Sequence, residues 1–301
     1  MTPAIRTQRL SKVYGDRTVV ADLDLNVPTG CVYGFLGPNG SGKTTTMKMI
    51  LSLVRPSRGA IELMGRPLDR STRRSLLRRV GSLIEAPPGY GHLTGGENMR
   101  VVQRLLGLSD RQVTRAVETV RLRDHLGRKV GTYSLGMKQR LGIAMALARE
   151  PALLLLDEPT NGLDPAGIEE IRDLLSALAA AGTTVMVSSH LLGEIDRTAT
   201  VLGILGGGRL LFEGPREDLL ARSAPEVLFE TSDPRHAASL VAPHHRVRID
   251  GATVRVRGVD HRATARIVAA LVRHGVDVHG VSRERRSLED VFRDLTGGRG
   301  L

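Results

Sequence analysis

The stretch that decides the fold reads Val32-Tyr33-Gly34-Phe35-Leu36-Gly37-Pro38-Asn39-Gly40-Ser41-Gly42-Lys43-Thr44-Thr45. Residues 37–44 match the pattern Gly-x-x-x-x-Gly-Lys-Thr of a phosphate-binding loop, between an apolar run and a helical segment. Glycine lets backbone N–H groups turn inward as a nest for phosphate oxygens. A helix that begins at the loop adds partial positive charge. We therefore predict an α/β fold with a nucleotide site at this loop.

The side chains of the loop divide into anchors and ligands. Lys43 is long enough to reach the β- and γ-phosphates of a nucleotide, and the Thr44 hydroxyl is a ligand for Mg²⁺. The predicted nucleotide-binding residues of this segment are Gly37, Pro38, Asn39, Gly40, Ser41, Gly42, Lys43, Thr44 and Thr45.

A second apolar run, Leu153–Leu156, ends in Asp157 and Glu158. The same pattern also occurs where an ordinary buried strand ends at the protein surface. Downstream of a phosphate-binding loop, however, it is typical of a Walker B strand. Asp157 is then predicted to hold Mg²⁺ indirectly and Glu158 to polarise the attacking water. His190 follows the apolar run that begins at Val185, where a residue that senses the γ-phosphate is expected.

Together these residues resemble the ATP-binding subunits of ABC transporters, and the resemblance covers about residues 4–220. Tyr14 matches the aromatic residue that stacks on adenine in that family. The segment Asn161-Gly162-Leu163-Asp164 matches its D-loop, which makes Asp164 a predicted nucleotide contact, and His190 matches its switch histidine. The resemblance implies that ATP and Mg²⁺ are the cofactors. It also implies three catalytic residues, which are Lys43, Glu158 and His190.

The signature motif of the family is recognisable at Tyr133-Ser134-Leu135-Gly136-Met137. In the common form Leu-Ser-Gly-Gly-Gln, the first glycine stands where this chain has Leu135 and the glutamine where it has Met137. Ser134 and Gly136 are retained, and they offer a hydroxyl and an N–H at a helix start. Family members act as head-to-tail dimers, so these two residues are expected to contact the nucleotide of a second copy.

Glu85 follows the apolar run Val80–Ile84, at a position where the family normally has glutamine. This substitution and the form of the signature resemble the ATPase subunits of bacitracin and lantibiotic self-protection exporters, which pair with a separate permease. The resemblance places Glu85 near Mg²⁺, and we predict it as a ligand of metal and nucleotide. The alternative is an exposed salt bridge with Arg79. For the whole chain the alternatives are a polyketide-drug exporter, an importer, and a soluble ABC ATPase.

The order of apolar runs predicts a parallel-dominated core with an antiparallel edge. Strands are expected at Arg17–Ala21, Leu23–Val27, Val32–Leu36, Gly59–Leu63, Val80–Ile84, Leu153–Leu156 and Thr184–Ser188. Helices are expected at about Thr44–Leu53 and Ile168–Ala180, and the helical spacing of Val113, Val117 and Val120 indicates a helical subdomain at about 88–149.

A domain boundary is predicted between residues 222 and 223. The ATPase domain is then 1–222, and 223–301 is a small α+β accessory domain. In the latter, Asp250-Gly251 predicts a β-hairpin, and Ser287 with Asp290 resembles a capping box.

The composition constrains the partners of the chain. There are 43 basic and 32 acidic residues, a net charge of +11, and Arg66, Arg70, Arg73, Arg74, Arg78 and Arg79 cluster in one segment. That cluster fits nucleic acid, an anionic membrane leaflet or a solvated helix face. Without interleaved aromatic residues, no nucleic acid is expected. Cys31 is the single cysteine, no leader is evident, and no apolar run is long enough to span a bilayer. The resemblance then implies a peripheral subunit at the cytoplasmic face of the membrane.

Overall fold

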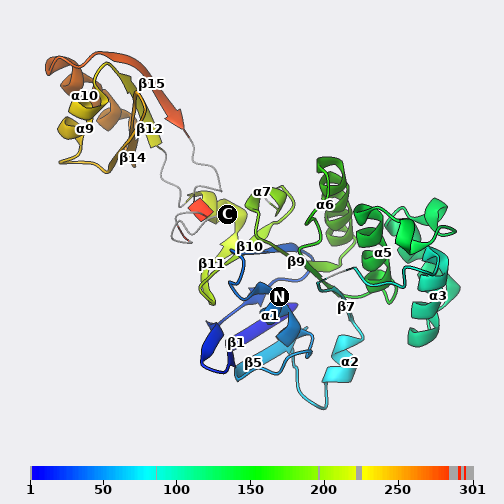
Figure 1. The fold of residues 1–301 in the computed structure, drawn as a ribbon. Helices are drawn as coiled ribbons and strands as arrows, with labels where there is room; N and C mark the ends of the chain where they lie inside the picture. Colours follow the sequence, from blue (N-terminus) through cyan, green and yellow to red (C-terminus); the bar gives the residue numbers. More distant parts are fainter. Residues whose placement is uncertain are drawn as a thin grey trace. The chain divides into compact units, whose positions relative to one another are not determined.

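The computed structural model describes residues 2–85, 87–195, 197–221, 226–284, 291–292 and 295. They form two compact units (Figure 1). The first ends at Arg216 and also includes Phe292, and the second extends from Glu217 to Val291. The boundary predicted between residues 222 and 223 lies outside the described residues, as does the predicted capping box at Ser287 and Asp290.

A six-stranded sheet forms the centre of the first unit, in the order β11-β10-β4-β9-β8-β7. Its strands are β4 (Val32–Leu36), β7 (Val80–Leu83), β8 (Leu153–Asp157), β9 (Thr184–Ser189), β10 (Val201–Gly206) and β11 (Arg209–Pro215). Neighbouring strands are parallel except at the β10–β11 edge. Every residue of β4, β8 and β9 is buried, as expected for parallel strands covered on both faces. Their carboxyl ends therefore meet at one edge.

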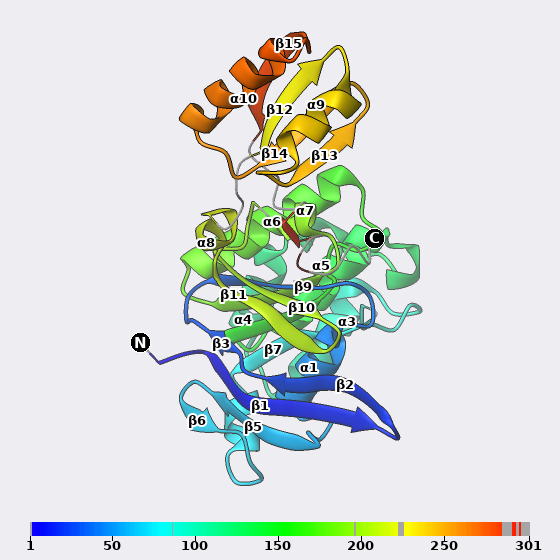
Figure 2. The same ribbon diagram turned by 90° about the vertical axis from the view of Figure 1, so that its left-hand side faces the viewer.

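A second, antiparallel sheet belongs to the same unit and has the order β2-β1-β5-β6, with β3 also paired to β1. Its strands are β1 (Ile5–Tyr14), β2 (Arg17–Leu23), β3 (Asn26–Val27), β5 (Arg58–Leu63) and β6 (Arg66–Pro67). Figure 2 shows β1, β2 and β5 side by side in this sheet.

The single strand predicted at Leu23–Val27 is wrong, because β2 ends at Leu23 and only Asn26–Val27 form β3. At the break, side chains supplement the backbone bond from the Thr7 N–H to the Leu25 carbonyl, which measures 2.9 Å. The Thr7 hydroxyl donates to the Leu23 carbonyl at 2.7 Å and accepts from the Leu25 N–H at 2.8 Å. Asp24 accepts from the Arg9 N–H at 2.6 Å. The backbone polar groups at the break are thus satisfied without strand pairing.

Helix α1 (Lys43–Ile50) joins the two sheets into one core and ends three residues before the predicted end at Leu53. Its Met47, Met49 and Ile50 are buried in the same cluster as residues of both sheets, among them Leu10, Leu63, Leu153, Leu155 and Met186. The phosphate-binding loop is therefore fixed on one side by a buried strand and on the other by a buried helix.

The predicted helical subdomain consists of α3 (Gly95–Leu106), α4 (Asp110–Thr119) and α5 (Leu135–Leu147), with short 3₁₀ turns at Arg123–His125 and Val130–Thr132. Two capping boxes begin its first helices. Thr94 with Glu97 caps α3, and Ser109 with Gln112 caps α4. Outside this subdomain, residues 2–221 also form α2 (Arg73–Leu77), α6 (Pro165–Ala180), α7 (Leu192–Ile195) and α8 (Arg216–Ala221).

The second unit is a four-stranded antiparallel sheet in the order β13-β14-β12-β15 with two helices. Its elements are β12 (Glu226–Thr231), α9 (Pro234–Val241), β13 (Val247–Asp250), β14 (Thr253–Arg257), α10 (His261–Arg273) and β15 (Val278–Glu284). Asp250 pairs with Thr253 across the predicted hairpin. Val227, Phe229, Val254, Val256 and Leu271 belong to a core of its own. The predicted fold class, an α/β core with an antiparallel edge, a helical subdomain and an extra α+β part, is confirmed.

Candidate active site

The phosphate-binding loop connects β4 to α1 and depends on its glycines. Gly42, which caps the helix, has φ 104°, and Gly40 has φ 79°, both in the region that favours glycine. A Cβ on Gly42 would lie 2.9 Å from the Val19 carbonyl oxygen, and one on Gly37 would lie 2.6 Å from the Leu205 carbonyl oxygen. The loop therefore has room for backbone alone, which suits the binding of phosphate by N–H groups.

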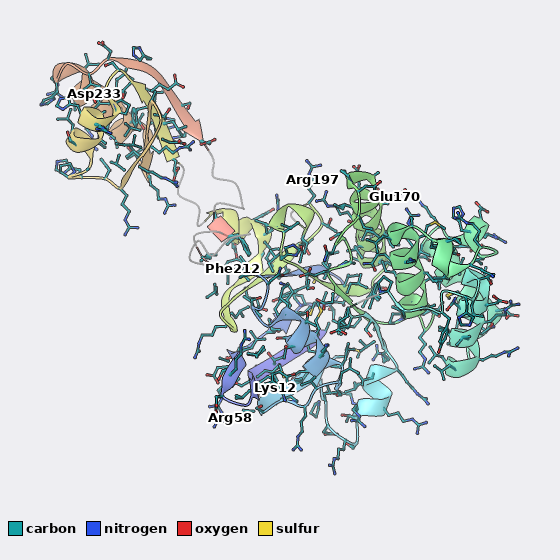
Figure 3. All side chains as sticks on the ribbon, in the orientation of Figure 1. Lys12, Arg58, Glu170, Arg197, Phe212 and Asp233 are labelled. Atoms are coloured by element: carbon teal, nitrogen blue, oxygen red, sulfur yellow. The ribbon has the colours of Figure 1, made fainter. Side chains whose placement is uncertain are left out.

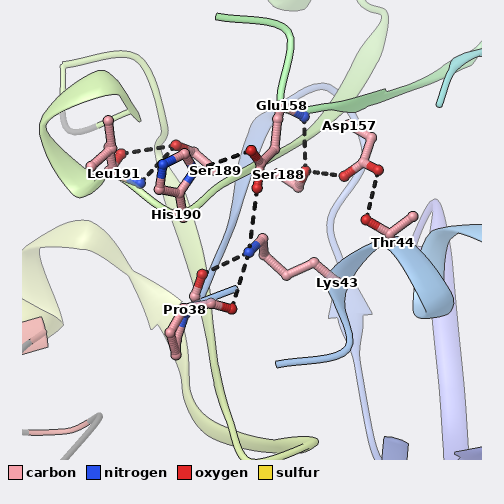
Figure 4. Close-up of polar contacts among 10 residues, drawn as sticks. Pro38, Lys43, Thr44, Asp157, Glu158, Ser188, Ser189, His190 and Leu191 are labelled. Atoms are coloured by element: carbon pink, nitrogen blue, oxygen red, sulfur yellow. Dashed lines mark hydrogen bonds and ion pairs between the residues drawn. The ribbon is translucent and has the colours of Figure 1, made fainter. Parts of the chain in front are cut away.

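Lys43 is buried beneath this loop, with 5% of its side chain exposed. Its Nζ donates to the carbonyl oxygens of Gly37 at 2.7 Å and Pro38 at 3.4 Å (Figure 4). It also lies 3.6 Å from Glu158 Oε1. Burial lowers the pKa of Lys43, and the carboxylates of Glu158 and Asp157 oppose that shift. The cation is thus held at the place where a phosphate is expected.

Thr44 and Asp157 meet at the carboxyl edge of the central sheet. The Thr44 hydroxyl donates to Asp157 Oδ2 at 2.7 Å. The other carboxylate oxygen, Oδ1, accepts from the Ser188 hydroxyl at 2.5 Å, and that hydroxyl accepts from the Glu158 N–H at 3.0 Å. A hydroxyl and a carboxylate oxygen in contact are donor types that Mg²⁺ takes, so these two predicted metal ligands fit the ion.

Glu158 joins the two halves of the site, as Figure 4 shows. Its Oε1 faces Lys43, while its Oε2 lies 3.1 Å from Nδ1 of His190. The backbone of Glu158 has φ 47°, a left-handed conformation that is uncommon outside glycine and that concentrates at functional sites. The three predicted catalytic residues are therefore brought together around one carboxylate.

Tyr14 ends strand β1 and is 48% exposed, so a face of its ring is accessible to a planar base. The ammonium of Lys12 lies 4.6 Å from the ring centroid, a cation–π contact. Lys12 also donates to the Arg55 carbonyl at 2.9 Å. The aromatic residue predicted to stack on adenine is thereby oriented by a neighbour that the sequence analysis did not identify.

The signature residues and the D-loop share a cavity of about 540 Å³ that is lined by Ser134, Gly136 and Asp164 among others. Ser134 caps α5 and accepts from the Met137 N–H at 3.2 Å. Asp164 caps α6 and accepts from the Gly167 N–H at 2.9 Å. No residue of the phosphate-binding loop lines this cavity. That separation is what a contact with the nucleotide of a second copy requires.

Two side chains join α5, which begins in the signature motif, to α6, which follows the D-loop. Arg140 of α5 forms an ion pair with Glu170 of α6, and both line the same cavity. This ion pair joins α5, which Ser134 caps, to α6, which Asp164 caps.

Glu85 is placed differently from the other predicted ligands. Its side chain is 65% exposed and its φ is 67°. The carboxylate pairs with Nζ of Lys48 on α1 at 2.5 Å, and not with Arg79. The structure thus links Glu85 to the helix that carries Lys43 and Thr44, through a residue that was not predicted.

Ser188 is a third residue that was not predicted, after Lys12 and Lys48, and a signal for it exists in the sequence. It follows an apolar run, as Asp157 does, and the ends of parallel strands lie at the same edge. The register pairs Asp157 with Ser188. Choosing Ser188 over Ser189 requires that register, which the sequence does not display.

A comparison with known proteins decides the family. The model of the ABC transporter family matches residues 20–161. The bacitracin transport ATP-binding protein BcrA of Bacillus licheniformis is 40% identical over 99% of both chains. This chain belongs to the ABC transporter ATP-binding proteins.

Other relatives of the ABC subunit have names that refer to other compounds. The lantibiotic transport ATP-binding protein SrtF of Streptococcus pyogenes is 43% identical over 69% of this chain and 90% of its own. The daunorubicin/doxorubicin resistance ATP-binding protein DrrA of Streptomyces peucetius is 37% identical over 98% and 93%. The chain is therefore the ATP-binding subunit of an ABC transporter related to antibiotic and drug exporters, and it hydrolyses ATP for transport.

Solved structures with this fold illustrate its assemblies. One is cbiO1 of Clostridium perfringens, part of the complex cbiONQ (TM-score 0.68, 25% identity, 73% of this chain and 92% of that one). Another is a dimeric ATP-binding cassette with ADP and Pi (TM-score 0.63, 25% identity, 70% and 98%). ABC ATPase subunits thus dimerise and pair with permease subunits. In the described part of this chain, no helix is both long and apolar enough to cross a bilayer.

Proposed function

We propose that this subunit powers the export of a peptide antibiotic, such as bacitracin or a lantibiotic, through a separate membrane permease. One observation carries the proposal. A bacitracin transport ATP-binding protein matches the chain almost from end to end, so the similarity includes the second unit and not only the ATPase fold. Glu85, in place of the usual glutamine, supports the same subgroup.

We further propose how the site works. Lys43 and the loop bind the β- and γ-phosphates, Tyr14 stacks on adenine, and Thr44 with Asp157 holds Mg²⁺, which neutralises phosphate charge when bound. Glu158 accepts a proton from the attacking water and His190 orients that carboxylate. Ser134, Gly136 and Asp164 complete the site of a second copy. The subunit then acts as a homodimer at the cytoplasmic face of the membrane.

The test uses antibiotic-sensitive bacteria that express the chain together with a candidate permease. Minimal inhibitory concentrations of bacitracin, of a lantibiotic and of daunorubicin are measured for the wild type and for Glu158→Gln. The proposal expects resistance to bacitracin or the lantibiotic that disappears in the variant. Resistance to daunorubicin alone would contradict it.

A polyketide-drug exporter is the second candidate, and one relative favours it. The daunorubicin/doxorubicin resistance protein also covers nearly all of this chain, at 37% identity. The daunorubicin arm of the same test distinguishes the two.

A further inference from the structure

An arginine-rich surface lies on the first unit, outside the nucleotide site. It consists of eight exposed side chains, which are Arg55, Arg58, Arg66, Arg70, Arg73, Arg74, Arg78 and Arg79. We call these eight residues the arginine surface. They come from the segment after α1, from β5 and β6, and from α2 and its ends. In Figure 1, β5 and α2 lie at the same end of this unit, and Figure 3 labels Arg58 there.

The arginine surface has no carboxylate partner in the part of the chain that the structure describes. Among the residues that the structure describes, no ion pair joins any of the eight to a carboxylate. Elsewhere arginines do pair, as Arg115 does with Glu150 and Arg255 with Glu284. The positive charge of this face is therefore available to bind an anionic partner.

Asp69 is the acid nearest to the cluster in sequence, and its own loop occupies it. Its Oδ1 accepts from the N–H of Ser71 at 2.7 Å, from the Ser71 hydroxyl at 2.6 Å and from the Thr72 N–H at 3.0 Å. These bonds, that of the Ser71 hydroxyl first, lower the pKa of Asp69 to about 2. Asp69 thus stabilises a turn; its carboxylate stays ionised but forms no ion pair with the arginines, which outnumber it eight to one.

Part of this face is concave. Arg55, Arg58, Arg70 and Arg73 line a cavity of about 750 Å³, and Val54, Pro56, Pro67 and Leu68 supply apolar walls. Guanidinium groups bind phosphate oxygens in bidentate fashion. Leu53, next to this lining in sequence, is 67% exposed. Cations beside exposed apolar side chains are the composition of a surface that rests on a membrane.

We propose that the arginine surface binds the phosphate headgroups of anionic phospholipids and so attaches the subunit directly to the membrane leaflet. This inference rests on the proposed function, which supplies the membrane. A leaflet fits better than nucleic acid because residues 55–79 contain no aromatic side chain for base stacking. It fits better than one acidic peptide because the charges extend over a loop, two strands and a helix.

The experiment is co-sedimentation of the full chain with phosphatidylcholine vesicles that contain or lack phosphatidylglycerol. The test variant is Arg70→Glu, Arg73→Glu and Arg74→Glu together. The matched control is Arg262→Glu, Arg266→Glu and Arg273→Glu on α10, which changes the net charge equally. We expect the wild type and the control to bind only the vesicles with phosphatidylglycerol, less tightly as salt is added. The test variant should bind them about tenfold more weakly or worse.

Three results would overturn the proposal. They are equal binding of the wild type to both kinds of vesicle, unchanged binding of the test variant, and equal loss in the control. If the wild type does not bind the vesicles but binds polyglutamate or an oligonucleotide, the arginine surface is a site for that kind of partner instead. ATP binding and hydrolysis are measured on the same proteins. A wild type that hydrolyses ATP but does not bind the vesicles refutes only this inference, whereas a wild type that binds the vesicles but does not hydrolyse ATP refutes only the proposed function.

Discussion

At the scale of single residues, Glu158 lies beside both of the other predicted catalytic residues. One oxygen of its carboxylate faces Lys43 and the other faces His190, and the backbone beneath it is left-handed. A residue held in that way is positioned rather than free to rotate, which is what a general base requires. Lys43, in contrast, donates to carbonyl oxygens of the phosphate-binding loop. We therefore expect it to contribute to the binding of ATP.

Glu158→Gln keeps the shape of the side chain and removes its basicity. We expect ATP to bind with nearly unchanged affinity, while the rate of hydrolysis falls about 100-fold or more, because general base catalysis contributes that much. The variant should also accumulate as an ATP-bound dimer in gel filtration. Lys43→Ala is the comparison, and it should abolish ATP binding because a buried charge-assisted contact is lost. Equal loss of binding in both variants would refute the two roles.

Glu85 offers a test of what its charge does. Glu85→Gln is isosteric, removes a negative charge and weakens the ion pair with Lys48. We expect nearly unchanged ATP affinity, an altered Mg²⁺ dependence of hydrolysis and weaker resistance in cells that contain the permease. Lys48→Met removes the same ion pair but leaves the carboxylate, so it separates the pair from the charge. If Glu85→Gln equals the wild type in all three assays, Glu85 is an ordinary surface acid.

At the scale of elements, apolar runs predicted several strands of the first unit, although the largely buried β10 was not among them. The fully buried β4, β8 and β9 were anticipated in place. Strand β1 was not, because its burial does not alternate and its register shifts between Leu10 and Lys12 and again at Val13. A bulged strand shows no period of two, so the sequence alone does not reveal it.

The contact between β7 and α5 connects the central sheet to the helical subdomain. A Cβ on Gly81 of β7 would overlap the carbonyl oxygen of Ala146 on α5, which is backbone and cannot rotate away. We expect Gly81→Ala to lower the free energy of unfolding by about 1–3 kcal/mol, as overpacking does. Gly127→Ala, where nothing lies within 4 Å, is the control and should change stability little. Urea denaturation of both variants measures the difference, and equal stabilities would show that β7 and α5 adjust freely.

At the scale of the whole molecule, the predicted hairpin at Asp250-Gly251 lies within the second unit. The predicted boundary between residues 222 and 223 stays a prediction. The return of Phe292 to the first unit was not predicted, because a contact between residues far apart in the chain has no local signature. The candidate site shows the same limit. Its loop could be read from the sequence, but the bond from Ser188 to Asp157 depends on strand register.

Removing the second unit tests whether the nucleotide site depends on it. Two hydrophobic clusters of described residues share no member, with the buried residues of one within 4–205 and those of the other within 227–276. A chain that ends at Ala221 should therefore fold and bind ATP with nearly full-length affinity, as measured by calorimetry. It should also be less stable than the full chain, because it loses Phe292, which belongs to the first unit and is 9% exposed.

Phe292→Ala in the full chain separates that loss from the loss of the second unit. Truncation of a buried phenylalanine costs about 3–5 kcal/mol, and less where a side chain is not completely enclosed. If Phe292 alone connects the tail to the first unit, urea denaturation should give Phe292→Ala and the truncated chain similar stabilities for the ATPase transition. A truncated chain much less stable than Phe292→Ala would mean that the second unit itself stabilises the first. A truncated chain that neither folds nor binds ATP would show that the ATPase domain does not end near residue 222.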